Sequence, residues 1–174
     1  SNENARSLHR GWRESPDEVP GASLTGTGIH VLDAFVNLMG PIRRVEAQFL
    51  AHRPPPEPLD TLSVLFEFVN GASGVLCGVR TTPLFWRVHV FGTEGSVESV
   101  GATELVLRRS GAQPQRLGFE PVNALRYELE AFADAVEGRA PYPIPVSQML
   151  DTAGALEAIV TSMHTRAPVI LSAP

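Results

Sequence analysis

The sequence predicts an α+β fold: a mostly antiparallel, open β-sheet with helices packed on one face. Helical periodicity appears near the start of the chain and in its last third, while the middle alternates apolar and polar residues at strand period. The strand-like segments follow one another through short turns. Strands joined in this way are antiparallel, because a parallel pair needs a crossover of about a dozen residues or more. Helices on one face of such a sheet make the class α+β.

Three helices are expected. The first runs from about Thr25 to Met39 and stops at Gly40-Pro41. The second runs from about Asn123 to Glu137, and the third from Ser147 to about His164. Each carries an apolar stripe at helical spacing: Ile29, Leu32, Val36 and Met39 in the first; Leu125, Leu129, Phe132 and Val136 in the second; Met149, Ala153, Leu156, Val160 and Met163, which we expect to be buried, in the third.

Strands fill the region from Ile42 to about Glu120, and a last short strand is expected at Pro168–Leu171. Asn70-Gly71 is a strong hairpin signal between two of the strands. Some strands carry apolar residues on both of their faces, such as Val64 and Leu65. The second face of the sheet is therefore not expected to be fully exposed to solvent. The single cysteine, Cys77, lies in an apolar run and is expected to be a buried structural thiol.

Composition excludes several kinds of chemistry. The 174 residues have the length of one domain, which we expect to span 1–174. The net charge of −5 is spread without long runs, so no nucleic acid or membrane partner is expected. All 14 basic residues are arginine, which excludes a lysine Schiff base or P-loop lysine within this chain. One cysteine, no zinc-type spacing and no visible signal peptide favour the cytoplasm and no metal.

The segment from Gly21 to Gly40 has the strongest chemical signal. At helical pitch His30, Asp33 and Asn37 fall on one face, opposite the apolar stripe. An imidazole exchanges protons near neutral pH, and the amide groups at a helix N-terminus suit an anionic or hydroxyl-rich ligand. The same pattern is also typical of an ordinary solvated helix face. We expect His30 at the exposed mouth of a concavity.

Four stretches in order resemble the C-terminal domain of the Gfo/Idh/MocA family (glucose–fructose oxidoreductase, inositol dehydrogenase, rhizopine catabolism). They are Gly11-Trp12-Arg13; Gly21 to Gly40 with Gly28-Ile-His30; Val90-Phe-Gly-Thr-Glu-Gly-Ser-Val-Glu98; and the closing helices with Tyr127-Glu-Leu-Glu-Ala-Phe132 and Leu156-Glu-Ala-Ile159. Each motif alone is weak, and the resemblance rests on their order along nearly the whole chain.

The resemblance implies a parent enzyme, an NAD(P)-dependent oxidoreductase acting on a sugar, polyol or related small molecule. Its N-terminal Rossmann domain, which holds NAD or NADP and a catalytic Glu-Lys-Pro lysine, is then expected outside this chain. We find no Gly-x-Gly-x-x-Gly between a strand and a helix, so the chain alone is expected to be inactive and to bind no cofactor.

Within this chain the resemblance places the catalytic histidine at His30. Asp33 matches a family position that is mainly structural but lies near the substrate. Trp12, Arg13 and His89 are further candidates for contact with the substrate, and a structural role fits each of them equally well. The aspartate that the family places one turn before the histidine is replaced by Gly26.

Two readings of the function therefore remain. In one the parent is a working dehydrogenase or reductase. In the alternative it is a weak or inactive relative that serves as a ligand-binding or dimerisation module. In both, the uncovered face of the sheet is expected to form a homodimer.

Overall fold

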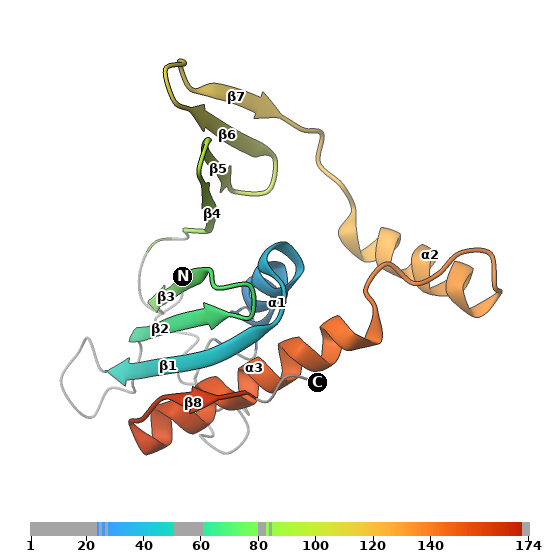
Figure 1. Cartoon of the computed structure of the whole chain (residues 1–174). Helices are drawn as coiled ribbons and strands as arrows, with labels where there is room; N and C mark the ends of the chain where they lie inside the picture. Colours follow the sequence, from blue (N-terminus) through green and yellow to red (C-terminus); the bar gives the residue numbers. More distant parts are fainter. Residues whose placement is uncertain are drawn as a thin grey trace. The chain divides into compact units, whose positions relative to one another are not determined.

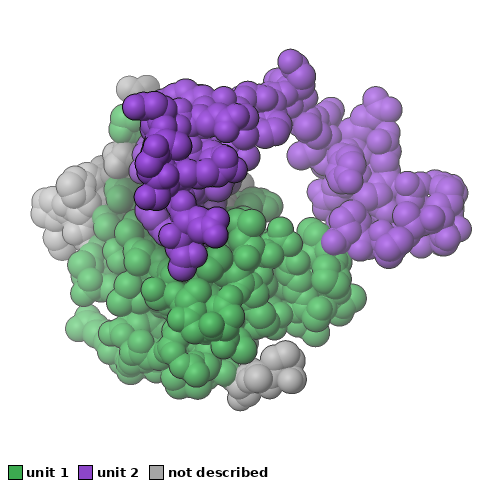
Figure 2. Space-filling model, turned by 45° about the horizontal axis from the view of Figure 1, so that its top comes forward, with its two compact units in different colours: residues 1–84, 144–174 green, residues 85–143 purple. Residues whose placement is uncertain are grey.

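The computed structural model describes residues 24, 26, 28–50, 61–79, 83 and 85–171. The chain divides into two compact units, coloured separately in Figure 2. Unit 1 comprises residues 1–84 and 144–174, and unit 2 comprises residues 85–143. The strands form two antiparallel four-stranded sheets, one in each unit, with the orders β3-β2-β1-β8 and β4-β5-β6-β7 (Figure 1). The predicted α+β class is confirmed.

Unit 1 is a sheet with two helices on one face. Its helices are α1 (Gly28–Met39) and α3 (Val146–Thr165), and its strands are β1 (Ile42–Leu50), β2 (Thr61–Phe68), β3 (Ser73–Val79) and β8 (Val169–Ile170). Alternate side chains of β1 and β2 are buried, because only one face of the sheet meets the helices. The core combines Leu32 and Val36 of α1 with Ala155, Ala158 and Ile159 of α3 and the inward residues of the strands.

The end of α1 is tied to the turn between β2 and β3. Gly40 has a φ of +85° and its amide donates to the Val36 carbonyl, which closes the helix as the sequence predicted. Asn70 donates from Nδ2 to the Met39 carbonyl at 2.9 Å and accepts the Ala72 amide at Oδ1. Gly71 takes a φ of +87°, so the predicted Asn-Gly hairpin is confirmed.

Two predictions about unit 1 are wrong. Cys77 is exposed rather than buried, because β3 directs its neighbour Leu76 inward and therefore Cys77 outward. The predicted stripe of α3 is wrong in part: Leu156 and Met163 are partly buried against the core, but the fully buried face of the helix is a different one. It consists of smaller residues that let the helix lie close to the sheet, while Met149 and Ala153 are exposed. The buried residues are Thr152, Ala155, Ala158, Ile159 and Ser162.

Unit 2 contains β4 (Arg87–Gly92), β5 (Gly95–Val100), β6 (Glu104–Arg109), β7 (Gln115–Gly118) and α2 (Ala124–Val136). The single sheet expected from the sequence is therefore divided, because periodicity identifies strands but not their hydrogen-bonding partners. Gly95 is required at the turn between β4 and β5, since a Cβ there would lie 2.1 Å from the Arg108 carbonyl oxygen. Asn123 caps α2 as predicted, but none of the helix residues is buried.

A buried carboxylate joins three strands of unit 2. Glu98 on β5 is 4% exposed and pairs with Arg87 of β4 through Oε1 and with Arg108 of β6 through Oε2, each at 2.7 Å. The hydrogen bond from Arg108 and the charge of Arg87 hold the pKa of Glu98 below its ordinary value, against the opposite effect of burial. The ionised carboxylate therefore stabilises the folded sheet.

We predict that this contribution is lost in acid. Because the folded pKa is depressed, the stabilisation is present above the ordinary pKa of 4.5 and disappears as the pH falls through it towards the folded value. Glu98→Gln should lower the melting temperature of unit 2 at pH 7, and its difference from wild type should shrink below about pH 4.5. Amide hydrogen exchange of β5 at several pH values measures this. Glu94→Gln, in the exposed turn, is the control. A Glu98→Gln deficit that does not change with pH would contradict the prediction.

Candidate functional site

A groove between α1 and α3 is the candidate site. It has a volume of about 730 Å³ and lies entirely within unit 1. One wall is apolar and follows α3 at helical spacing, while the polar groups come from both helices. The lining residues are Ile29, His30 and Asp33 of α1, Ile144 before α3, and Met149, Thr152, Ala153, Leu156, Glu157, Val160 and Thr161 of α3.

His30 lies where the sequence predicted, in the first turn of α1, exposed and lining the groove. The start of this helix is closely packed. Leu24 is buried beneath it, and a Cβ on Gly28 would lie 2.8 Å from the Leu24 Cδ1 atom. Gly28 therefore permits an approach that a larger residue would prevent without displacing Leu24. This packing fixes the turn that carries His30.

Asp33 connects the two helices. Its Oδ1 atom accepts a hydrogen bond from Gln148 Nε2 at 3.0 Å and another from Thr152 Oγ1 at 3.1 Å. Thr152 is buried, so its hydroxyl needs this partner. Within the part of the chain that the structure describes, Oδ2 accepts no hydrogen bond. Asp33 therefore has a structural contact at one oxygen and a second oxygen available to a ligand in the groove.

The other candidates are not brought into the groove. Trp12 and Arg13 lie outside the described residues. Asn37 is exposed on α1 but does not line the groove. His89 belongs to unit 2, where its ring contacts that of Phe91 with 3.9 Å between centroids, and its buried Nε2 atom has no hydrogen-bond partner among the described residues.

Gly26 has open space around it, since a Cβ there would meet nothing within 4 Å. Packing among the described residues would therefore accept a side chain at this position. The lack of a carboxylate one turn before His30 is not imposed by the fold.

Sequence reasoning missed the contribution of α3. Gln148, Thr152, Glu157 and Thr161 are polar residues on a helix whose pattern suggested only a buried stripe. No local signal marks them, because their position depends on how α3 crosses α1. In the described residues, no three His, Cys, Asp or Glu side chains gather closely enough to hold a metal ion. None of the described helices has both the length and the hydropathy needed to span a bilayer.

We predict that Asp33 stabilises unit 1 through its contacts with α3. Asp33→Ala should lower the free energy of unfolding by about 1–3 kcal/mol, because it leaves the buried Thr152 hydroxyl without an acceptor. Asp33→Asn keeps an acceptor oxygen and should cost less. Asn37→Ala, a change at an exposed position of the same helix, should stay within about 0.5 kcal/mol. Urea denaturation measures all three. Equal losses for Asp33→Ala and Asn37→Ala would show that the contact contributes nothing.

Solved structures share this fold. A proposed NADPH-dependent oxidoreductase from Desulfitobacterium hafniense has 25% identity and a TM-score of 0.84, over 97% of this chain and 54% of its own. Aldose-aldose oxidoreductase from Caulobacter crescentus, in complex with glycerol, has 22% identity and a TM-score of 0.77, over 93% of this chain and 51% of its own. An oxidoreductase from Agrobacterium radiobacter, in complex with NAD+, L-tartaric acid and magnesium, has 16% identity and a TM-score of 0.71, over 90% and 53%.

The chain thus spans about half the length of these solved proteins. A comparison with curated proteins finds no significant match. The family model described as the GFO/IDH/MocA C-terminal domain matches residues 1–98, more than half of the sequence. The resemblance seen in the ordered motifs is confirmed, and the chain belongs to the GFO/IDH/MocA C-terminal domain family.

Proposed function

We propose that this chain is the substrate-side domain of a two-domain, nicotinamide-dependent oxidoreductase. Family membership supports this, as does the match to about half of each related solved chain. The remaining half would be an N-terminal Rossmann domain that supplies the cofactor site and a catalytic lysine, because this chain has no lysine and no dinucleotide fingerprint. The chain alone would then be inactive.

The observation that carries the proposal is the pairing of His30 and Asp33 in one groove. His30 is exposed in the first turn of α1, and Asp33, three residues later, is held by α3 through Oδ1, while its Oδ2 accepts no hydrogen bond from any described residue. An imidazole here would exchange a proton with the reacting hydroxyl or carbonyl oxygen, and the free carboxylate oxygen would accept a hydrogen bond from a neighbouring hydroxyl of the substrate. A bound nicotinamide would accept or deliver the hydride.

The groove also indicates the kind of substrate. Thr161 and Glu157 bring a hydroxyl and a carboxylate to α3's side of the groove, and Met149, Leu156 and Val160 form an apolar wall. A substrate with hydroxyl groups on one side of its carbon skeleton would place them against the polar side chains and its carbon atoms against the apolar wall. We therefore infer that the substrate is a sugar, polyol or related hydroxy compound. The cofactor would be NAD or NADP. Among related structures, one is described as NADPH-dependent and another holds NAD+.

Gly26 favours a second candidate function. Without a carboxylate one turn before His30, the polarisation of the reacting hydroxyl would be weaker, and a parent with this defect would serve as a ligand-binding or dimerisation module. Kinetics of the parent protein distinguish the two functions.

We also propose that the chain forms a homodimer through its second sheet. The outer face of the first sheet is mixed, with Glu46, Gln48 and Ser63 beside Leu65. The second sheet, by contrast, has one mostly apolar face, on which Ser99 is polar and Val88 is buried, and α2 of the same unit buries no residue. The register places these side chains on that face: Val88, Val90, Val97, Leu105, Leu107 and Leu117.

We predict that His30→Ala lowers kcat/KM of the parent enzyme by about 10²-fold or more, because the mutant cannot exchange the proton. His164→Ala, on the last turn of α3 and outside the groove, is the control. Gly26→Asp should raise the rate, since the open space around Gly26 admits the carboxylate. Absorbance of the reduced nicotinamide follows the reaction with sugars and polyols. If wild type and His30→Ala are equally inactive, the alternative module is supported; equal measurable rates would show that His30 is structural.

The dimer gives a separate prediction. Light scattering on the purified chain should give twice the mass of 18.8 kDa at micromolar concentration, with more than about 1,000 Å² buried in total. Val97→Glu, at the exposed centre of the apolar face, should produce monomers, whereas Glu46→Gln on the first sheet should not. A monomeric wild type would refute this arrangement.

A further inference from the structure

The charges of the groove between α1 and α3 bear on the kind of substrate that it can take. Two of its lining residues are carboxylates, Asp33 of α1 and Glu157 of α3, and its one basic group is the imidazole of His30. No arginine is among the lining residues, and the sequence contains no lysine. Within the part of the chain that the structure describes, the lining therefore carries negative charge and no permanent positive charge that would balance it.

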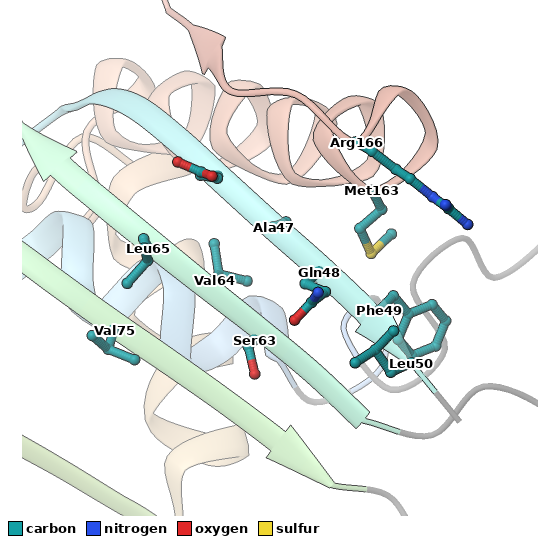
Figure 3. A pocket seen from close by; sticks show the side chains of 11 residues that line it. Ala47, Gln48, Phe49, Leu50, Ser63, Val64, Leu65, Val75, Met163 and Arg166 are labelled. Atoms are coloured by element: carbon teal, nitrogen blue, oxygen red, sulfur yellow. The ribbon is translucent and has the colours of Figure 1, made fainter. Parts of the chain in front are cut away.

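The described arginines of unit 1 lie elsewhere. Arg43 and Arg44 are on β1, where they pair with Glu67 and Glu46 of the first sheet. Arg166 follows α3 and lines a hollow over β1, β2 and β3, which Figure 3 shows. That hollow and the groove have no lining residue in common. None of these guanidinium groups is therefore available to bind an anionic substrate in the groove.

The two carboxylates of the groove differ in their surroundings. Asp33 is held by α3 through its Oδ1 atom. Glu157 is exposed, and no described residue forms an ion pair with it. Its neighbours on the same wall of the groove are the apolar side chains of Ala153, Leu156 and Val160. The charge of Glu157 is therefore not offset by a cation of the described residues, and it faces whatever the groove binds.

The course of the two helices places Glu157 towards His30. The helix α1 leads into β1, and α3 leads into β8, which is antiparallel to β1. The two helices cover the same face of the sheet and therefore run in opposite directions. The turn before Asp33, which carries His30, then corresponds to the part of α3 after Thr152, the residue that contacts Asp33. Glu157 is five residues beyond Thr152, or about 7.5 Å along the helix.

We propose that Glu157 determines the charge of the substrate. The groove takes hydroxy compounds that are neutral or carry an ammonium group, and it rejects those that carry a carboxylate or a phosphate. An ammonium group pairs with Glu157, a neutral hydroxyl donates a hydrogen bond to it, and an anionic group is repelled by it. This inference rests on the proposed function, because it concerns the substrate of the same groove.

Equilibrium binding to the purified chain tests the inference without cofactor or turnover. The isotopically labelled chain is titrated at pH 7 with glucosamine, glucose and glucuronate, which share one sugar ring and differ in charge. Amide chemical shifts of α1 and α3 give the dissociation constants. Glucosamine should bind most tightly and glucuronate most weakly, with steps of about threefold, as expected for an exposed ion pair. Equal affinities, tighter binding of glucuronate, or no binding of any of the three would overturn the proposal.

Substitutions of Glu157 isolate its contribution from that of other groups. Glu157→Gln keeps the shape without the charge and should bring the three affinities to within about twofold of one another, and Glu157→Lys should reverse their order. Asp151→Asn, on the same helix but outside the groove, should keep the wild-type order. Because Glu157 is exposed, its variants should melt at the wild-type temperature. A wild-type order in Glu157→Gln would show that another group selects the charge, and the proposal would be wrong.

These outcomes are distinct from those of the turnover assay. A parent protein that oxidises no sugar or polyol, together with binding that is ordered by charge and depends on Glu157, would refute the proposed activity and leave this inference intact. Turnover of glucose and glucuronate with equal kcat/KM, lost for both in His30→Ala, would overturn this inference and leave the proposed activity intact.

Discussion

The close packing of α3 on the first sheet determines most of what unit 1 can do. The contact surface consists of small residues, with Ala155, Ala158 and Ser162 almost completely buried. Ser162 Oγ accepts a hydrogen bond from the Ala47 amide, just beyond the last residue of β1 that pairs with β8. A helix side chain therefore satisfies this backbone amide at the edge of the sheet. A larger residue at these positions would separate the helix from the sheet, and the groove between α1 and α3 would change shape, because α3 contributes one of its walls.

The candidate site follows from this placement. With α3 fixed on the sheet, Gln148 and Thr152 meet Asp33, and this contact sets α1 relative to α3. Leu24 beneath Gly28 then fixes the first turn, which presents His30 to the groove. The histidine is therefore positioned by a chain of contacts that begins in the core. The position of His30 does not depend on a flexible loop among the described residues. The groove can therefore already have its shape before a substrate binds, as catalytic geometry requires.

Unit 2 is stabilised differently. Its sheet has two distinct faces: one carries the buried Glu98 with Arg87 and Arg108, and the other is apolar. The ionic face gives the sheet a stability that depends on pH, while the apolar face and the unburied stripe of α2, with Leu125, Leu129, Phe132 and Val136 exposed, leave surfaces suited to further contacts. Unit 1 differs because its own helices, α1 and α3, cover the apolar face of its sheet.

The sequence by itself determined the α+β class, the C-terminal end of α1, the Asn-Gly hairpin, the family and the exposed position of His30, because periodicity, turn chemistry and ordered motifs are local properties. Only the tertiary structure decided which face of α3 is buried, that Cys77 points outward, and that the strands divide into two sheets. It also decided that Gln148 and Thr152 reach Asp33. The placement of α3 depends on contacts between residues more than 100 positions apart, as for Asp33 with Thr152 and Ala47 with Ser162, and no local pattern encodes such a pairing.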